Sequence, residues 1–142
     1  MLTLAQAETI LAGVLAHAKA NAFKPLAIAI VDARGALKLF TAQDGTPLKR
    51  GDIATGKADG CIALGLGGRA LQRFAIDRPY FIQGATHATG GSLVPVVGGV
   101  LIRSPEGEVL GAIGISGDTS DNDEIAALAG IAKAGLVGET GA

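Results

Sequence analysis

The N-terminal segment carries apolar side chains at helical spacing. An apolar stripe extends to about Asn21 and consists of Leu4, Ala7, Leu11, Val14, Leu15 and Ala18. Residues three and four positions apart lie on one face of an α-helix, so the stripe predicts an amphipathic helix packed on a core. Thr3 followed by Gln6 has the spacing of a capping box and predicts where this helix begins.

Two later segments have the pattern of β-hairpins. In the first, the apolar run 26–31 is followed by a turn at 32–35 and a returning strand over 36–42. In the second, two strands flank the turn at Glu106-Gly107 and extend from about Gly98 to Ser116. Strands joined by a tight turn are antiparallel, so both hairpins predict an antiparallel sheet.

Alanine-rich stretches predict further helices at about 51–64, 69–76 and 121–136. Residues 79–95 combine an apolar stretch with Gly90-Gly91, and there we expect a short strand followed by a glycine-rich loop containing His87. Beyond the last helix we expect a loose tail over 138–142. The predicted order is α-β-β-α-α-β-β-β-α, an α+β fold in a single domain spanning residues 1–142.

Composition and charge exclude several classes of protein. The 12 Lys and Arg nearly balance the 13 Asp and Glu, and aromatic residues make up 4% of the chain, so we expect no nucleic-acid partner. The single cysteine, Cys61, cannot form an intrachain disulfide. No run of about 18 apolar residues is present, so we expect no membrane partner and a cytoplasmic location.

The second hairpin carries the first candidate binding site. Glycine inside a strand is typical of close approach by another backbone or a ligand, and backbone amides at the start of a helix can hold an anion. We therefore expect a ligand at Gly98, Gly99, Gly114, Ser116, Gly117 and Asp118. The alternative is that these amides are satisfied by helix caps, with Ser120 paired to Asp123 or Asp121 to Glu124.

Three other side chains are candidates for ligand binding or chemistry. Lys57 would project from its helix toward a ligand carboxylate, although an ordinary surface lysine is an equal alternative. His87 and Asp123 are the candidates for moving a proton, and His87 is also a candidate donor to a metal. A solvated loop histidine is the commoner explanation for His87, and a partly buried structural histidine for His17.

The assembled motifs resemble the GlcG/HbpS-like family of haem-binding proteins, which is related to the C-terminal domain of PduO-type proteins. The resemblance covers nearly the whole chain and is carried by the N-terminal helix and by residues 26–35, 54–58, 98–102, 106–117 and 123–126. It implies a profilin-like antiparallel sheet flanked by helices and assembly into a homo-oligomer. Haem is the possible cofactor that it implies. His87 is the candidate iron ligand on its own chemistry, because a neutral imidazole can bind haem iron, and not through a match to the family.

Three hypotheses follow. The first is a small-ligand-binding protein whose tetrapyrrole lies between the loop around His87 and the turn 116–118, with Lys57 lining the pocket and an apolar surface formed by Val94, Val96, Val97 and Leu101. The second is an enzyme of small hydroxy- or keto-acid catabolism that uses proton transfer. The third is a structural or assembly subunit without catalysis.

Overall fold

The computed structural model describes residues 1–142. It contains five helices and five strands in the order α1 (Leu4–Ala20), β1 (Ala27–Asp32), β2 (Leu37–Ala42), α2 (Arg50–Leu64), α3 (Gly68–Asp77), α4 (Pro79–Ala88), β3 (Gly99–Arg103), β4 (Val109–Ser116), α5 (Ser120–Lys133) and β5 (Val137–Glu139). None of these helices has the length and apolarity needed to cross a membrane. The predicted α+β class and the two hairpins are confirmed.

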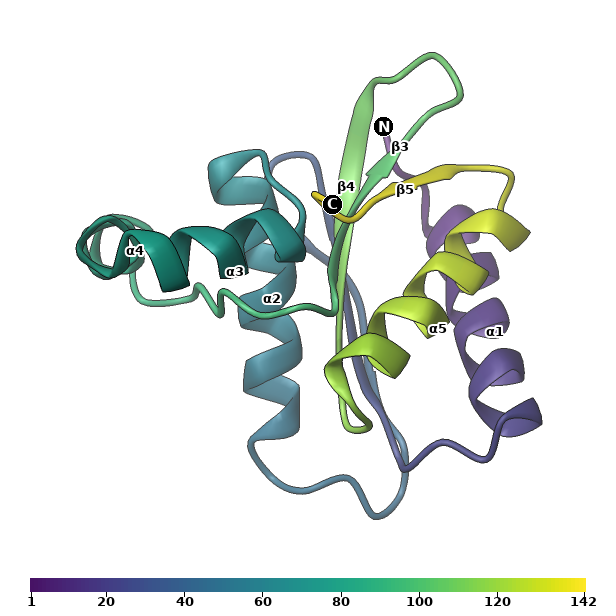
Figure 1. The fold of residues 1–142 in the computed structure, drawn as a ribbon. Helices are drawn as coiled ribbons and strands as arrows, with labels where there is room; N and C mark the ends of the chain where they lie inside the picture. Colours follow the sequence, from purple (N-terminus) through teal and green to yellow (C-terminus); the bar gives the residue numbers. More distant parts are fainter.

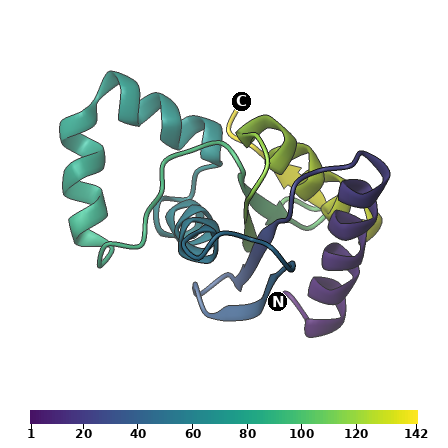
Figure 2. The same cartoon turned by 90° about the horizontal axis from the view of Figure 1, so that it is seen from below.

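The strands form one antiparallel sheet in the order β2-β1-β4-β3-β5. Helix α2 covers one face of the sheet, and α1 and α5 cover the other (Figure 1). Seen along the sheet, the molecule therefore has three layers, and α3 and α4 extend away from them as a separate arm (Figure 2).

Residues alternate along β1 between the two sides of the sheet. Ile28 and Ile30 belong to the large core beneath α1 and α5, whereas Ala27 and Ala29 pack with Ala54 of α2. Successive side chains of a strand point to opposite faces, which explains this division. The small side chains on the second face let α2 lie close to the sheet.

The interior glycines of the second hairpin are covered by α2. A Cβ at Gly114 would overlap the carbonyl oxygen of Ala54, and one at Gly99 would lie 2.8 Å from both the Lys57 carbonyl oxygen and Cys61 Sγ. Gly99 and Gly114 are also paired across β3 and β4. The close approach expected at these two glycines is therefore made by the backbone of a helix.

The segment 79–95 differs from the prediction. Residues 79–88 form helix α4, with Pro79 in its first turn, and no strand is present there. Proline is favoured at the first helical position because its missing N–H has no helical partner there, and this overrides the strand preference of the aromatic residues that follow. Ile82 is the buried residue of α4, which packs on α3.

The C-terminal tail also differs from the prediction, because it is paired rather than loose. Strand β5 pairs with β3, Arg103 bonds to Glu139, and the Arg69 N–H donates to the Thr140 carbonyl at 2.9 Å. The tail thus becomes one edge of the sheet.

Helix ends are where the remaining differences lie. The predicted capping box of Thr3 and Gln6 is present at α1. Helix α5 ends at Lys133 rather than near residue 136, and its N-cap is Thr119, whose side chain accepts from the Asn122 N–H at 3.1 Å. Neither of the two expected capping pairs forms this cap.

Candidate functional site

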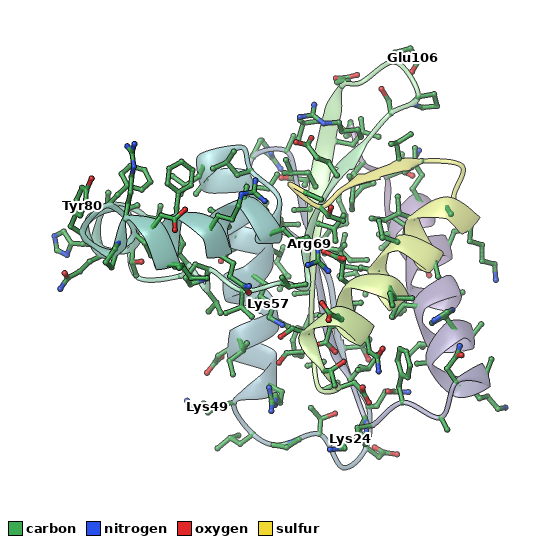
Figure 3. The ribbon with its side chains drawn as sticks, viewed as in Figure 1. Lys24, Lys49, Lys57, Arg69, Tyr80 and Glu106 are labelled. Carbon is green, nitrogen blue, oxygen red and sulfur yellow. The ribbon has the colours of Figure 1, made fainter.

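The most deeply buried charged pair joins α2 to the start of α5. Lys57 Nζ lies 3.4 Å from Asp123 Oδ2 and donates to the Ile115 carbonyl at 2.8 Å. The two residues are 3% and 1% exposed. Lys57 and Asp123 are both candidates from the sequence, and the structure brings them together in the interior. Figure 3 shows Lys57 on α2, beside the sheet.

Burial shifts both groups toward their neutral forms. Desolvation lowers the pKa of Lys57, opposed by the attraction of Asp123, and a smaller lowering comes from Arg50. Desolvation likewise raises the pKa of Asp123, opposed by Lys57 and by the Asp118 N–H. Removing a charged group from water favours the uncharged state, so each ionised partner depends on the other.

The turn after β4 is held by its own side chains. The Asp118 N–H donates to Asp123 Oδ1 at 3.0 Å. The Asp118 carboxylate accepts from the backbone N–H groups of Lys24 and Thr119 and from the Asn122 side chain, which lowers its pKa. Of the two explanations considered for this turn, internal capping accounts for the amides of residues 118, 119 and 122.

Arg50 also contacts the turn after β4, although the sequence analysis does not name it as a candidate site residue. Its Nη1 donates to Ser116 Oγ at 3.2 Å, and Ser116 is fully buried. Arg50 and Lys57 are seven residues apart on α2, which places them on the same helix face. That spacing is the signal in the sequence by which Arg50 could have been found.

The backbone at Gly98 packs directly against the Lys57 ammonium group. Its φ is +118°, and a Cβ at this position would lie 2.7 Å from Lys57 Nζ and 2.9 Å from the Ile115 carbonyl oxygen. Only glycine adopts such a backbone conformation readily, so the segment before β3 closes directly over the amine.

A second group of charges links α3 to α5. Arg69 donates from Nε and Nη2 to Glu124 Oε1 at 3.1 and 2.9 Å, and Nη2 also reaches Asp121 Oδ1 at 3.0 Å. The other oxygen of Glu124, Oε2, is buried without a hydrogen-bond partner. The expected pairing of Asp121 with Glu124 is thus replaced by a shared contact with Arg69.

His87 lies apart from the Lys57 pair, on the exposed surface of α4. Lys57 lies in the interior against the sheet, whereas Tyr80 marks the outer end of the arm (Figure 3). Val97 and Leu101 are buried in the core, so the apolar surface expected from them is not available to a macrocycle. His17 contacts Phe23, edge to face, at 5.5 Å between ring centroids.

An apolar cleft of about 430 Å³ lies between α4 and the end of α2. It is lined by Leu64, Tyr80, Phe81, Gly84, Ala85, Ala88 and Thr89. His87 does not line the cleft, but its spacing of seven residues from Tyr80 and three from Gly84 places it on the helix face that those two residues share. Tyr80 is 72% exposed, and a Cβ at Gly84 would meet no atom within 4 Å.

Cations lie close to this cleft on the same arm. Arg73 and Arg78 line a neighbouring cleft of about 350 Å³ together with Ala70, Phe74 and Asp77. The Phe74 and Phe81 rings, one from each helix of the arm, lie 5.3 Å apart between centroids. The arm thus combines exposed apolar surface, an imidazole and two guanidinium groups.

Comparison with solved structures shows the same fold in other proteins. The crystal structure of a PduOC:heme complex has a TM-score of 0.83 at 22% identity, over 95% of this chain and 96% of that chain. The Klebsiella pneumoniae protein ORFY has a TM-score of 0.83 at 24% identity, over 94% and 90%. A double mutant of Streptomyces reticuli HbpS has a TM-score of 0.78 at 23% identity, over 92% and 85%. A search of curated proteins finds no match.

The family model described as "Haem degrading protein HbpS-like" matches residues 2–132. This range includes α1 to α4 and all of α5 except Lys133, and therefore Lys57, His87, Asp123 and the turn 116–118. The resemblance drawn from the sequence motifs is confirmed, and the chain belongs to the HbpS-like family.

Proposed function

We propose that this protein binds haem, or a closely related tetrapyrrole, in the cleft of the α3–α4 arm and works as a homo-oligomer. The observation that carries the proposal is the apolar cleft on α4, whose lining residue Ala88 follows the exposed His87 directly in the chain. Two comparisons favour haem as the ligand. The chain belongs to a family described as haem degrading, and it shares its fold with a protein whose structure is a PduOC:heme complex.

The lining of the cleft suits a flat apolar ligand. Tyr80 and Phe81 supply aromatic surface, and Gly84, Ala85 and Ala88 have small side chains that leave room over the helix. Glycine in the middle of a helix costs about 1 kcal/mol relative to alanine. The open space over Gly84 gives no reason for that cost within the chain, whereas a ligand lying against the helix gives one.

The polar groups on the arm suit the other parts of haem. A neutral imidazole is a common axial ligand of haem iron, and the exposed ring of His87 is free to take this role. Arg73 and Arg78 are suited to the two propionates, because guanidinium groups bind carboxylates with two parallel hydrogen bonds. The iron chemistry itself would be supplied by the haem.

The turn at Ser116, Gly117 and Asp118, with Lys57 beside it, stays a prediction as a second anion-binding region. Arg50 supports it, because only one bond from its guanidinium, to Ser116, is formed within the chain. The alternative, an enzyme of small hydroxy- or keto-acid catabolism in which Lys57 binds the carboxylate and His87 or Asp123 moves a proton, has less support. Lys57 and Asp123 are closed off from solvent, and His87 lies on another element.

Titration with haemin tests the proposal. We expect a shifted Soret band with the wild-type chain, and at least a tenfold weaker affinity for Gly84→Leu, because leucine fills the cleft; tenfold corresponds to about 1.4 kcal/mol. Gln83→Leu is the matched control, since Gln83 is exposed on the same helix and does not line the cleft. Equal affinity of the two variants would place the ligand elsewhere, and no Soret shift at all would refute haem binding.

A further inference from the structure

Helix α3 begins without a side-chain cap. Its N-cap residue is Gly67, which has no side chain to accept from the free N–H groups of the first turn. Such groups usually find an acceptor in a Ser, Thr, Asp or Asn at this position. Here the acceptor is the Thr140 carbonyl, to which the Arg69 N–H donates at 2.9 Å. The C-terminal tail therefore supplies the cap of a helix that begins much earlier in the chain.

Two glycines allow the tail and the helix to pack backbone against backbone. A Cβ at Gly67 would overlap the Thr140 carbonyl, and a Cβ at Gly141 would lie 2.8 Å from both the backbone nitrogen and the Cβ of Ala70. Gly141 also has a φ of +82°, which residues with a side chain rarely adopt. The C-terminus accordingly lies beside the start of α3 in Figures 1 and 2.

A second contact joins the tail to Arg73. The guanidinium donates from Nη2 to the Gly141 carbonyl at 2.6 Å, and Arg73 is otherwise exposed. A free arginine side chain on a surface samples many rotamers, so fixing it before a ligand arrives removes part of the entropy loss on binding. A guanidinium has five N–H groups, and the contact with Gly141 leaves others available to a ligand.

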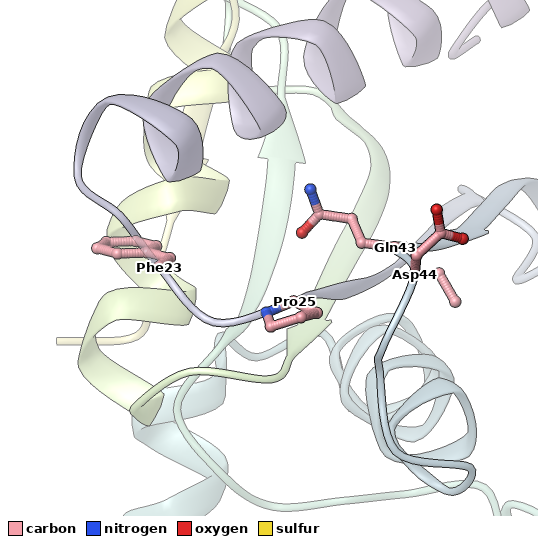
Figure 4. A pocket seen from close by; sticks show the side chains of 5 residues that line it. Phe23, Pro25, Gln43 and Asp44 are labelled. Carbon is pink, nitrogen blue, oxygen red and sulfur yellow. The ribbon is translucent and has the colours of Figure 1, made fainter.

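The cleft that Arg73 lines has an excess of positive charge. Among its lining residues, Arg73 and Arg78 face a single carboxylate, that of Asp77, and neither arginine takes part in an ion pair of the chain. The cleft is therefore suited to an anion. A larger cleft, of about 500 Å³, contains no cation (Figure 4) and is lined by Phe23, Pro25, Ala42, Gln43 and Asp44.

We propose that the C-terminal tail is a positioning element for the ligand, because it caps α3 and holds the Arg73 guanidinium at the cleft for a carboxylate of the ligand. The inference rests on the proposed function, in which Arg73 and Arg78 meet the haem propionates. The ion pair between Glu139 and Arg103 fixes the other end of the tail on the sheet. One short segment thus joins the sheet edge, the start of α3 and an arginine that binds the ligand.

Gly141→Ala tests the inference, because its Cβ pushes the tail away from Ala70 and leaves Arg73 itself unchanged. The two probes are haemin and haemin dimethyl ester, which lacks free carboxylates. We expect the variant to bind haemin about fivefold more weakly than wild type, since the ligand must now order the Arg73 side chain, and to bind the ester with wild-type affinity. Thr140→Val is the matched control. It keeps the carbonyl that caps α3 and loses an exposed contact with the Ala142 N–H, so wild-type affinity for both probes is expected.

Hydrogen exchange at the Arg69 amide provides a readout that needs no ligand, and Gly67→Ala displaces the tail from the side of the helix if Gly141→Ala folds poorly. In both variants the Arg69 amide is expected to exchange at least about tenfold faster than in wild type, because its acceptor has moved. Unchanged exchange in both would overturn the cap. A haemin affinity that stays at the wild-type value, or that falls equally with that of the ester, would overturn the positioning of Arg73 and leave haem binding intact. A wild-type chain without a Soret shift would instead refute the proposed function, and the role of Arg73 with it.

Discussion

The ammonium group of Lys57 lies 3.4 Å from Asp123 Oδ2, and both side chains are closed off from solvent. Lys57→Met leaves the carboxylate buried without its cation, so we expect the free energy of unfolding to fall by about 3–5 kcal/mol. Lys57→Met combined with Asp123→Asn removes both charges, and the double variant is expected to be more stable than the sum of the two single effects by at least about 1 kcal/mol. Denaturant unfolding of the four proteins measures this coupling, and strict additivity would contradict the paired arrangement.

The same substitution at two glycines is expected to have opposite effects. Gly114→Ala forces α2 away from β4, and we expect a loss of about 3 kcal/mol. Gly84→Ala adds a Cβ to open space in the middle of α4, and we expect a gain of about 0.5–1 kcal/mol. Thermal unfolding measures both, and a destabilised Gly84→Ala chain would show that the space over α4 is not free.

The Asp118 carboxylate is expected to make the folding stability depend on pH. Its hydrogen bonds, led by that from the Lys24 N–H, hold its pKa below the ordinary value of 3.8. A carboxyl group whose pKa is lowered on folding contributes stability above its unfolded pKa, and this contribution is lost as the pH falls through the folded pKa. Wild type should therefore exceed Asp118→Ala in stability by a constant amount above about pH 5, with a difference that shrinks below about pH 4. A difference independent of pH would contradict this role.

The thiol of Cys61 is expected to be inert in the folded protein. It is buried against Gly99, and burial raises its pKa to about 12, so almost no thiolate exists at neutral pH. A colorimetric thiol reagent should react with Cys61 only after denaturation. Rapid reaction under native conditions would show that the contact between α2 and β3 opens easily.

Much of the fold could be predicted from the sequence because its signals are local. Helix α1 combines a regular apolar stripe with the capping box of Thr3 and Gln6, and both hairpins contain turn residues between apolar runs. Helix α4 was missed because its aromatic residues favour strands and its only local helix signal is Pro79. Strand β5 was missed because it is ordered through β3 and α3, contacts that a local pattern cannot reveal.

The individual residues of the candidate site could be predicted from the sequence, but the contacts between them could not. Lys57 and Asp123 were each singled out, yet their contact joins elements 66 positions apart in the chain. The glycines of β3 and β4 were correctly interpreted as places of close approach, but only the fold shows that α2 is what approaches Gly114. His87 was grouped with Lys57, and the structure separates them because 79–88 is a helix on the arm.

Haemin titration of the two histidine variants tests the central claim most directly. His87 is exposed on α4, next in the chain to Ala88 of the apolar cleft, whereas His17 packs against Phe23 on another helix, α1, which makes His17→Ala a matched control. We predict that His87→Ala loses the Soret shift of the wild-type chain and that His17→Ala keeps it. A Soret shift that persists in His87→Ala, or that disappears in His17→Ala alone, would contradict the assignment of His87 as the iron ligand at this cleft.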